Sequence, residues 1–138
     1  MKLFDTHAHI GLIHEDPIEQ LIIGQEARQS DVKHIISICN SLSDFDSVYT
    51  NLETATHIYH SIGVSPSEVQ NPGLDWEMKI IEDSKLDRIV AVGEIGLDYY
   101  RKFGNRDSQV ELFIRQLELA DKLDKPVIIH NREAGEDI

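Results

Sequence analysis

Five short apolar segments are spaced along this chain, and a segment of helical character separates each one from the next. Apolar residues occupy both faces of most of these segments, which is typical of strands in a covered parallel sheet. Strands that alternate with helices in this way indicate consecutive βαβ units. The expected strands are residues 2–7, 34–39, 58–64, 88–94 and 126–130, and the expected helices are 16–30, 43–55, 74–85 and 108–124.

Two α/β architectures fit this order of elements. One is an open doubly wound sheet, and the other is the first part of a (β/α)8 barrel, which in full has ~250 residues. The residues alone leave both open. With 138 residues and 41% hydrophobic content, the chain is long enough for one domain with a core, which we expect to span residues 1–138.

The ends of two expected helices are marked by their sequences. Asp16 is suited to cap the first helix, with Pro17 at its first position and Glu19 completing a pattern that resembles a capping box. In the last helix, apolar residues recur at helical spacing, and they are expected to form the face that packs on the sheet. These residues are Val110, Phe113, Ile114, Leu117, Ala120 and Leu123.

The acidic composition limits the partners of the chain. A formal net charge of −12 argues against broad, non-specific adhesion to nucleic acid or to acidic membranes. A nucleic-acid enzyme is still possible, because bound divalent cations and local arginines can attract phosphate. No apolar run reaches the ~20 residues of a membrane span and no signal peptide is visible, so we expect a cytoplasmic protein without a membrane partner. The single cysteine, Cys39, is predicted to be a buried core thiol.

Ionisable residues gather where the expected strands end. Asp5, His7 and His9 lie at the end of the first strand, Glu94 ends the fourth strand, and His130 ends the fifth. The alternation of side chains along a strand places the first three on one side. Because the carboxyl ends of parallel strands share one edge, we expect all five side chains to lie close together.

This set of side chains suits a divalent cation. Imidazole nitrogen and carboxylate oxygen bind zinc and manganese, and a carboxylate such as Glu94 can bridge two cations. Asp5 is expected to orient His7 or His9 from outside the ligand shell. Each residue taken singly has a structural interpretation, but an unpaired buried carboxylate is costly. Convergence at one edge therefore favours a metal site.

The other histidines are weaker candidates for this site. His34 is expected at the opposite rim of the sheet, and His14 lies in the first loop as a minor candidate. His57 and His60 flank or occupy the third strand, and we expect them in the core or on the surface.

Four separated motifs resemble one family. The sequences FDTHAHI, SIGVSP, AVGEIGLDYY and QLELADKLDKPVIIHNREA are similar, in order and spacing, to those of the TatD family of metal-dependent deoxyribonucleases. The wider relatives are the amidohydrolase-like hydrolases. The resemblance implies a TIM-type (β/α)8 barrel, of which this chain supplies about the first five strands and four helices. It also implies hydrolysis of DNA, typically as a 3′→5′ exonuclease that prefers single strands.

The resemblance assigns roles to the residues at the strand ends. It implies that His7 and His9 hold one cation, that His130 ligates a second, and that both are magnesium, manganese or zinc. Glu94 would bridge the two cations or hold the attacking water, which makes it the expected catalytic residue. Asp5 remains the expected outer residue that supports this group.

The resemblance also implies substrate contacts. Asp98 and Tyr99 would shape the substrate pocket, and Arg132 would contact phosphate. Three further cations are expected to belong to a solvated loop, with attraction of a DNA backbone by their cluster as the alternative: Arg101, Lys102 and Arg106.

This chain departs from the family in two respects. Ser65 and Ser67 stand where the family usually has two histidines, so Ser65 is only a weak candidate for substrate binding. The family also continues for about as long again, and there it supplies another histidine ligand and a late aspartate. We therefore expect a truncated N-terminal part of a barrel, with little activity alone. Its strand edges would be covered by the missing C-terminal half or by self-association.

Two other functions stay open. One is a related hydrolase that acts on a small cyclic amide or ester, and the other is an inactive truncated remnant that binds metal or a partner. Glu94 favours the nuclease, because many amidohydrolases place a carboxylated lysine at the bridging position. The coding sequence after Ile138 would decide between the enzyme and the remnant. An open reading frame there with a further histidine and an aspartate at strand ends would favour the enzyme.

Overall fold

The computed structural model describes residues 1–138 and contains one parallel sheet with the strand order β1-β2-β3-β4-β5. Each strand therefore pairs only with its neighbours in sequence. A doubly wound sheet needs a point where the strand order reverses, and this sheet has none. The strands are β1 (Leu3–Ala8), β2 (Val32–Ser37), β3 (Ile58–Ile62), β4 (Ile89–Asp98) and β5 (Val127–Arg132).

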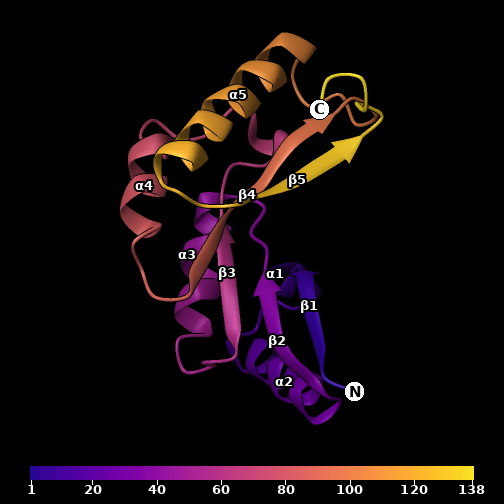
Figure 1. The fold of residues 1–138 in the computed structure, drawn as a ribbon, viewed down its shortest axis with the longest axis vertical. Coiled ribbons are helices and arrows are strands. Elements are labelled where there is room, and N and C mark those ends of the chain that lie inside the picture. Colours follow the sequence, from indigo (N-terminus) through magenta and orange to yellow (C-terminus); the bar gives the residue numbers. More distant parts are fainter.

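Helices follow the strands in the predicted alternation. Helices α3, α4 and α5 lie to the left of the strands in Figure 1, and α2 packs against β2. Asp16 caps α2 as predicted, because its carboxylate accepts hydrogen bonds from the backbone N–H groups of Ile18 and Glu19. The helices are α1 (Ile10–Ile13), α2 (Pro17–Gln29), α3 (Leu42–Asn51), α4 (Trp76–Asp83) and α5 (Arg106–Lys122), with a 3-10 turn, η1 (Pro66–Glu68). None of them combines the length and hydrophobicity that a membrane span requires.

The core lies between the sheet and its helices, in two clusters. The larger has 15 buried residues from the middle of the sheet, α4 and α5, and the smaller has 6 around α3 and the loop after it. Cys39 belongs to the larger cluster, which confirms the prediction of a buried thiol. Burial raises the pKa of this thiol to about 12, so it is protonated at neutral pH.

The buried face of α5 is wider than the predicted one. Phe113 and Ala120 are in the core as predicted, and Val110, Leu117 and Leu123 pack against it. Ile114 is 48% exposed, whereas Leu112 and Leu119 are buried together with the polar residues Gln109 and Gln116. Both glutamines are buried because their amides bond to the backbone of neighbouring segments. Hydrophobic periodicity assigns polar residues to the solvent, and so it left both glutamines out of the predicted face.

Strand β4 is longer than predicted. It continues to Asp98, so Glu94 lies inside the strand and not at its end, and β5 likewise continues past His130 to Arg132. The pairing register of β4 with β5 shifts between Gly93 and Ile95. At Gly96, with φ of 144°, an added Cβ would clash with the carbonyl oxygen of His130. Glycine therefore permits the close approach of the two strands beside Glu94.

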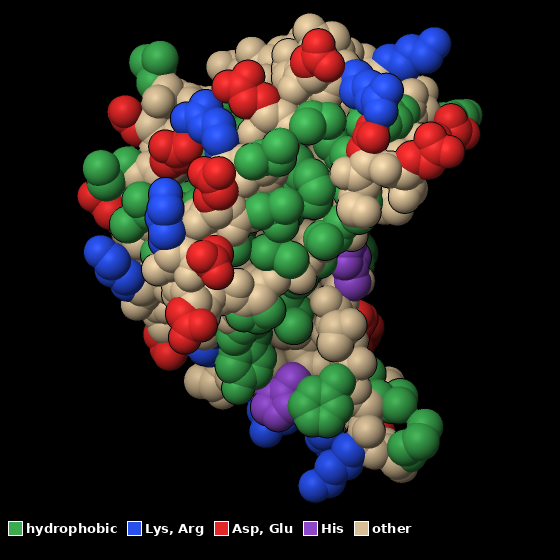
Figure 2. Space-filling view, turned by 45° about the horizontal axis from the view of Figure 1, so that its top comes forward, with side chains coloured by type: hydrophobic (Ala, Val, Ile, Leu, Met, Phe, Trp, Pro, Cys, Tyr) green, Lys and Arg blue, Asp and Glu red, His purple; other side chains and the backbone are tan.

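One face of the sheet is open. Strand β1 is exposed along most of its length, and both β1 and β5 have a neighbour on one side only. Figure 2 shows a band of hydrophobic side chains across the molecule. A hollow of about 340 Å³ on the sheet is lined by Phe4, His34, Ile36, Tyr59 and Val90 together with Asp5 and Thr6.

Candidate metal centre

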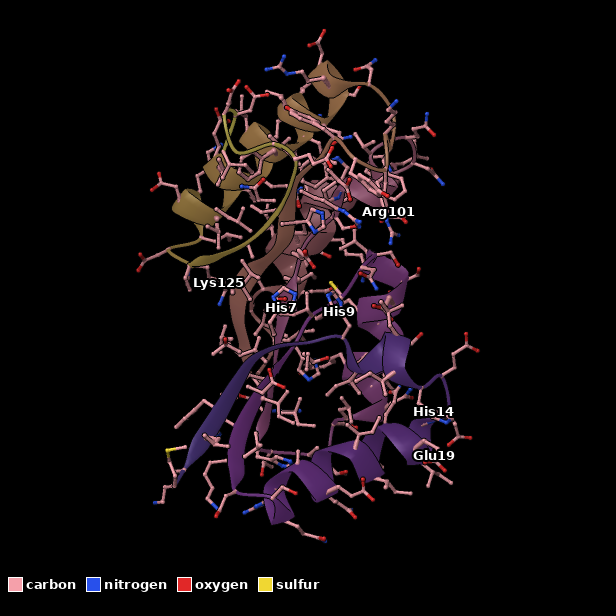
Figure 3. The ribbon with its side chains drawn as sticks, turned by 90° about the vertical axis from the view of Figure 1, so that its right-hand side faces the viewer. His7, His9, His14, Glu19, Arg101 and Lys125 are labelled. Atoms are coloured by element: carbon pink, nitrogen blue, oxygen red, sulfur yellow. The ribbon has the colours of Figure 1, made fainter.

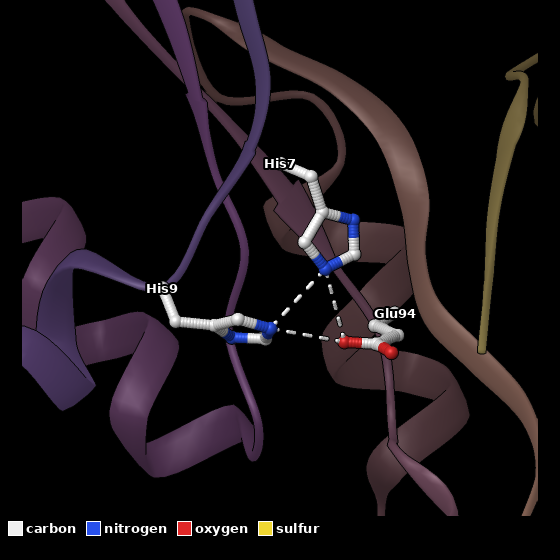
Figure 4. A group of neighbouring side chains, drawn as sticks. All are labelled: His7, His9 and Glu94. Carbon is white, nitrogen blue, oxygen red and sulfur yellow. Dashed lines mark hydrogen bonds and ion pairs between the residues drawn. The ribbon is translucent and has the colours of Figure 1, made fainter. Parts of the chain in front are cut away.

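Three side chains of ligand type converge at one edge of the sheet. His7 lies in β1, His9 directly follows that strand, and Glu94 comes from β4. The Nε2 atoms of His7 and His9 are 3.2 Å apart, and they lie 3.5 and 3.3 Å from Glu94 Oε2. Figure 4 shows the three side chains pointing toward one another. The predicted approach of these residues is therefore present in the fold.

The spacing of the three atoms fits one divalent cation. Zinc–nitrogen bonds of ~2.0 Å at tetrahedral angles place two ligand atoms about 3.3 Å apart, close to all three distances. The Glu94 side chain is 8% exposed, whereas that of His7 is 43% exposed, so the group is open on one side. An open side is what a metal centre needs in order to admit water or substrate. The donor set and its geometry therefore fit a catalytic cation.

His130 lies beside this group, on the other oxygen of the same carboxylate. Its Nδ1 is 2.6 Å from Glu94 Oε1, and its Nε2 is 3.2 Å from Asp98 Oδ2. Glu94 thus faces two histidines through one oxygen and a third histidine through the other. This arrangement suits a carboxylate that serves two neighbouring positions, as the prediction of a bridging ligand requires.

A pocket of about 220 Å³ opens over these residues. Its polar lining includes His9, Glu94, Asp98 and His130. Only one of the residues around it is hydrophobic, so the pocket suits a polar or charged ligand.

A family model described as TatD related DNase matches residues 4–138 of the chain. The chain belongs to the TatD family. This confirms the resemblance found in the sequence, and TatD-family proteins are metal-dependent hydrolases.

Two curated relatives cover nearly all of this TatD chain. The uncharacterized metal-dependent hydrolase YabD of Bacillus subtilis is 34% identical over 140 residues, which are 99% of this chain and 53% of YabD. The human deoxyribonuclease TATDN3 is 28% identical over 147 residues, which are 96% of this chain and 53% of TATDN3. The chain thus spans about half the length of these relatives.

A solved structure has the same fold over nearly all of this chain and about half of its own. The crystal structure of YjjV, a TatD homolog from Escherichia coli, matches with a TM-score of 0.80 and 27% sequence identity. The match covers 97% of this chain and 52% of YjjV. The five parallel strands therefore form about half of a TatD-type barrel, which confirms the predicted fold class.

Two predicted site residues of the TatD chain make contacts other than those expected. The carboxylate of Asp5 accepts a hydrogen bond of 3.1 Å from the backbone N–H of His7, so it holds the strand and not an imidazole ring. Tyr99 is absent from the lining of the pocket, and its hydroxyl lies 2.5 Å from Asp137 Oδ2. Burial and this hydrogen bond raise the pKa of Tyr99.

Other predicted substrate-binding residues do line the pocket. Asp98 is buried beneath it, and Arg132 lies with its guanidinium 4.1 Å from the centre of the Tyr100 ring. Ser65 lines it too, with its hydroxyl oxygen 2.5 Å from that of Ser67. The substitution of serines for the family's histidines therefore falls within the pocket itself.

Arg101 is the one member of a predicted cluster of cations that lines the pocket. The sequence placed it in a solvated loop with Lys102 and Arg106, and left attraction of a DNA backbone by this cluster as the alternative. Asn40 and Phe103 line it as well. Arg101 directly follows the AVGEIGLDYY motif, three residues after Asp98. The sequence does not tell in which direction its side chain points, whereas the structure places it in the lining of the pocket.

The remaining histidines lie outside the centre. Figure 3 shows His14 beside the start of α2, apart from His7 and His9. His34 stacks on Phe4 at the other end of the sheet, with ring centres 5.1 Å apart. His57 is buried next to the carbonyl oxygen of Gly24, at 2.9 Å. His60 is buried too, as its core interpretation predicted, and burial lowers its pKa to about 4.

Proposed function

We propose that this TatD chain belongs to a metal-dependent nuclease that hydrolyses DNA phosphodiester bonds, acting from the 3′ end of single strands. The observation that carries the proposal is the Glu94 carboxylate with histidines on both oxygens, beside a polar pocket. The name of the human relative, deoxyribonuclease TATDN3, supports DNA as the substrate.

The proposed ligands are His7, His9 and Glu94 for one cation, with Glu94 and His130 serving a second. Divalent metal at these positions supplies a Lewis acid for a phosphoryl oxygen and lowers the pKa of bound water. The residues of the chain hold and orient these groups. Asp98 fixes the ring of His130 through Nε2, and Arg132 offers a guanidinium to the anionic substrate.

The decisive experiment compares Glu94→Gln with the parent protein. Nucleotide release from a single strand labelled at its 3′ or 5′ end is measured with added magnesium, manganese or zinc, and bound metal is counted by mass spectrometry. Loss of a charged ligand should reduce activity by more than the 10–100-fold that is typical for residues outside the ligand shell. The metal content should fall in parallel.

The matched control is His14→Asn, which removes an exposed histidine outside the centre. It should leave activity within about twofold, as surface substitutions usually do. DNA cleavage that survives in Glu94→Gln, or that needs no metal, would contradict the proposal. Hydrolysis of a cyclic amide or ester in place of DNA would favour the related hydrolase, and metal binding without either activity would favour the inactive remnant.

A further inference from the structure

Two arginines in the pocket have no carboxylate partner, although acidic residues outnumber basic ones by 25 to 13 in this chain. Three of the four other arginines form ion pairs with carboxylates, Arg88, Arg106 and Arg115, and the fourth, Arg28, lies in α2 away from the pocket. Arg101 and Arg132 form none, even though both line the pocket together with Glu94 and Asp98. An unpaired guanidinium in so acidic a chain is available to an anionic ligand.

The nearby carboxylates are already engaged by other donors. Asp98 Oδ1 accepts a hydrogen bond of 2.8 Å from the backbone N–H of Arg101, and Oδ2 faces His130 Nε2. Both oxygens of Glu94 face imidazole rings. Asp98 therefore fixes the backbone of Arg101 and leaves its guanidinium free.

The other cations of the loop after β4 lie elsewhere. Arg106 binds both carboxylate oxygens of Asp137, at 2.8 and 2.7 Å. Lys102 follows Arg101 directly but does not line the pocket. Figure 3 shows Arg101 above His7 and His9, on the same side of the molecule. The loop thus offers one cation to the pocket.

Two further residues of the pocket lining bring no positive charge. Ser65 and Ser67 are neutral and bond to each other, so they offer an anion only hydroxyl groups. Arg132 is held over the ring of Tyr100, which limits the freedom that binding would have to remove. A guanidinium binds two phosphate oxygens in parallel, which a neutral wall of hydroxyl groups cannot match.

We propose that Arg101 acts together with Arg132 to bind the phosphodiester backbone of the substrate, so that Arg101 is a substrate-binding residue. This inference rests on the proposed function for DNA as the substrate, but the anion site itself does not require catalysis. The pair holds the non-bridging oxygens of a phosphate next to the Glu94 centre. Asp98 is the positioning residue that holds the backbone of Arg101.

The test measures binding of a short thymidine oligonucleotide, and separately of inorganic phosphate, in a buffer with a metal chelator. Arg101→Gln is compared with Lys102→Gln, which removes the same charge one residue away. We expect at least about tenfold weaker binding for Arg101→Gln, because a hydrogen bond to a charged group is lost. The slope of log affinity against log salt should fall by about 0.7 for one lost contact to a single strand. Lys102→Gln should change both values much less.

Equal losses in the two variants would mean that only net charge matters, and this would overturn the inference. So would unchanged binding in Arg101→Gln, or a parent protein that binds neither probe. Arg101→Lys should recover part of the affinity, and a thermal melt confirms that each variant is folded. Weaker phosphate binding by Arg101→Gln in a protein that cleaves no DNA would keep the anion site without supporting the nuclease. DNA cleavage by the parent protein, together with equal binding losses in Arg101→Gln and Lys102→Gln, would support the nuclease and refute the anion site.

Discussion

Glu94 contacts three histidines through two oxygens, and its side chain is 8% exposed. A buried carboxylate needs donors or cations to replace its lost hydration, and here each oxygen has imidazole neighbours. The glycines on either side of it permit the close pairing of β4 with β5. A single residue therefore joins the first, fourth and fifth strands at the candidate centre.

His60 should make the stability of the protein depend on pH. Burial, aided by Arg88, lowers its pKa from 6.5 to about 4. Between these values the unfolded chain binds a proton at His60 and the folded chain does not, so the free energy of unfolding falls as the pH falls. The contribution is fully present above about pH 6.5, and about 2 kcal/mol of it is lost between pH 7 and pH 5.

The check is urea unfolding at about pH 7 and pH 5 for the parent protein and His60→Leu. The variant keeps a similar volume between the rings of Phe45 and Tyr49 but cannot titrate. Its stability should therefore vary less with pH, by about the 2 kcal/mol expected from the pKa difference. The same pH dependence in both proteins would show that His60 is not the group responsible.

Residue types and spacing predicted which histidines meet Glu94, because strand alternation and the shared sheet edge are general rules. They could not predict the contacts of Asp5 and Tyr99, or which cation of the loop after β4 lines the pocket. Those depend on where a turn sends a side chain: Tyr99 reaches Asp137, and Arg101 lines the pocket. No local pattern in the sequence encodes either direction.

Among the contacts between elements, Gln116 links α5 to the segment that follows β3. Its amide oxygen accepts a hydrogen bond of 2.8 Å from the backbone N–H of Val64, and its amide nitrogen donates one of 2.9 Å to the carbonyl of Val64. Gln116→Leu would leave two buried backbone groups unsatisfied, at a cost of about 1–3 kcal/mol each. Chemical denaturation should therefore show a loss of about 2–6 kcal/mol in the free energy of unfolding.

Gln25→Leu is the matched control, because Gln25 is exposed in α2. It should change the stability by no more than about 0.5 kcal/mol. If the two variants lost the same amount, the bonds to Val64 would not be what holds α5 to the sheet.

The order of the elements was predictable because apolar runs and helix caps are local features. The length of β4 was not, since its last residues, Ile95 to Asp98, include a glycine and a carboxylate that break the strand pattern. The burial of two glutamines of α5 was not predictable either. The side chains of Gln109 and Gln116 form hydrogen bonds with the backbone of Asp98, Phe103 and Val64. These partners lie outside the helix, so the pattern within α5 does not reveal them.

For the molecule as a whole, we expect residues 1–138 on their own to self-associate. Phe4 is 64% exposed and Ile129 is 42% exposed on edge strands that have one neighbour each. Open strand edges and apolar faces favour association. The net charge of −12 opposes it, so association should increase with salt. Size-exclusion chromatography with light scattering, over a range of protein and salt concentrations, measures this.

Phe4→Thr should weaken the association, whereas Leu74→Thr, at a fully exposed leucine away from the sheet, should not. A compact monomer at every salt concentration, with one cooperative melting transition, would contradict the expectation.

The sequential strand order also has a consequence for synthesis on the ribosome. Every new strand finds its partner in the strand made just before it, so the sheet can grow one unit at a time as the chain emerges. His7 and His9 emerge first, and they face no carboxylate of the centre until Glu94 has left the exit tunnel. In the proposed metal centre, capture of the cation would therefore wait for translation of β4, because a shorter nascent chain lacks Glu94.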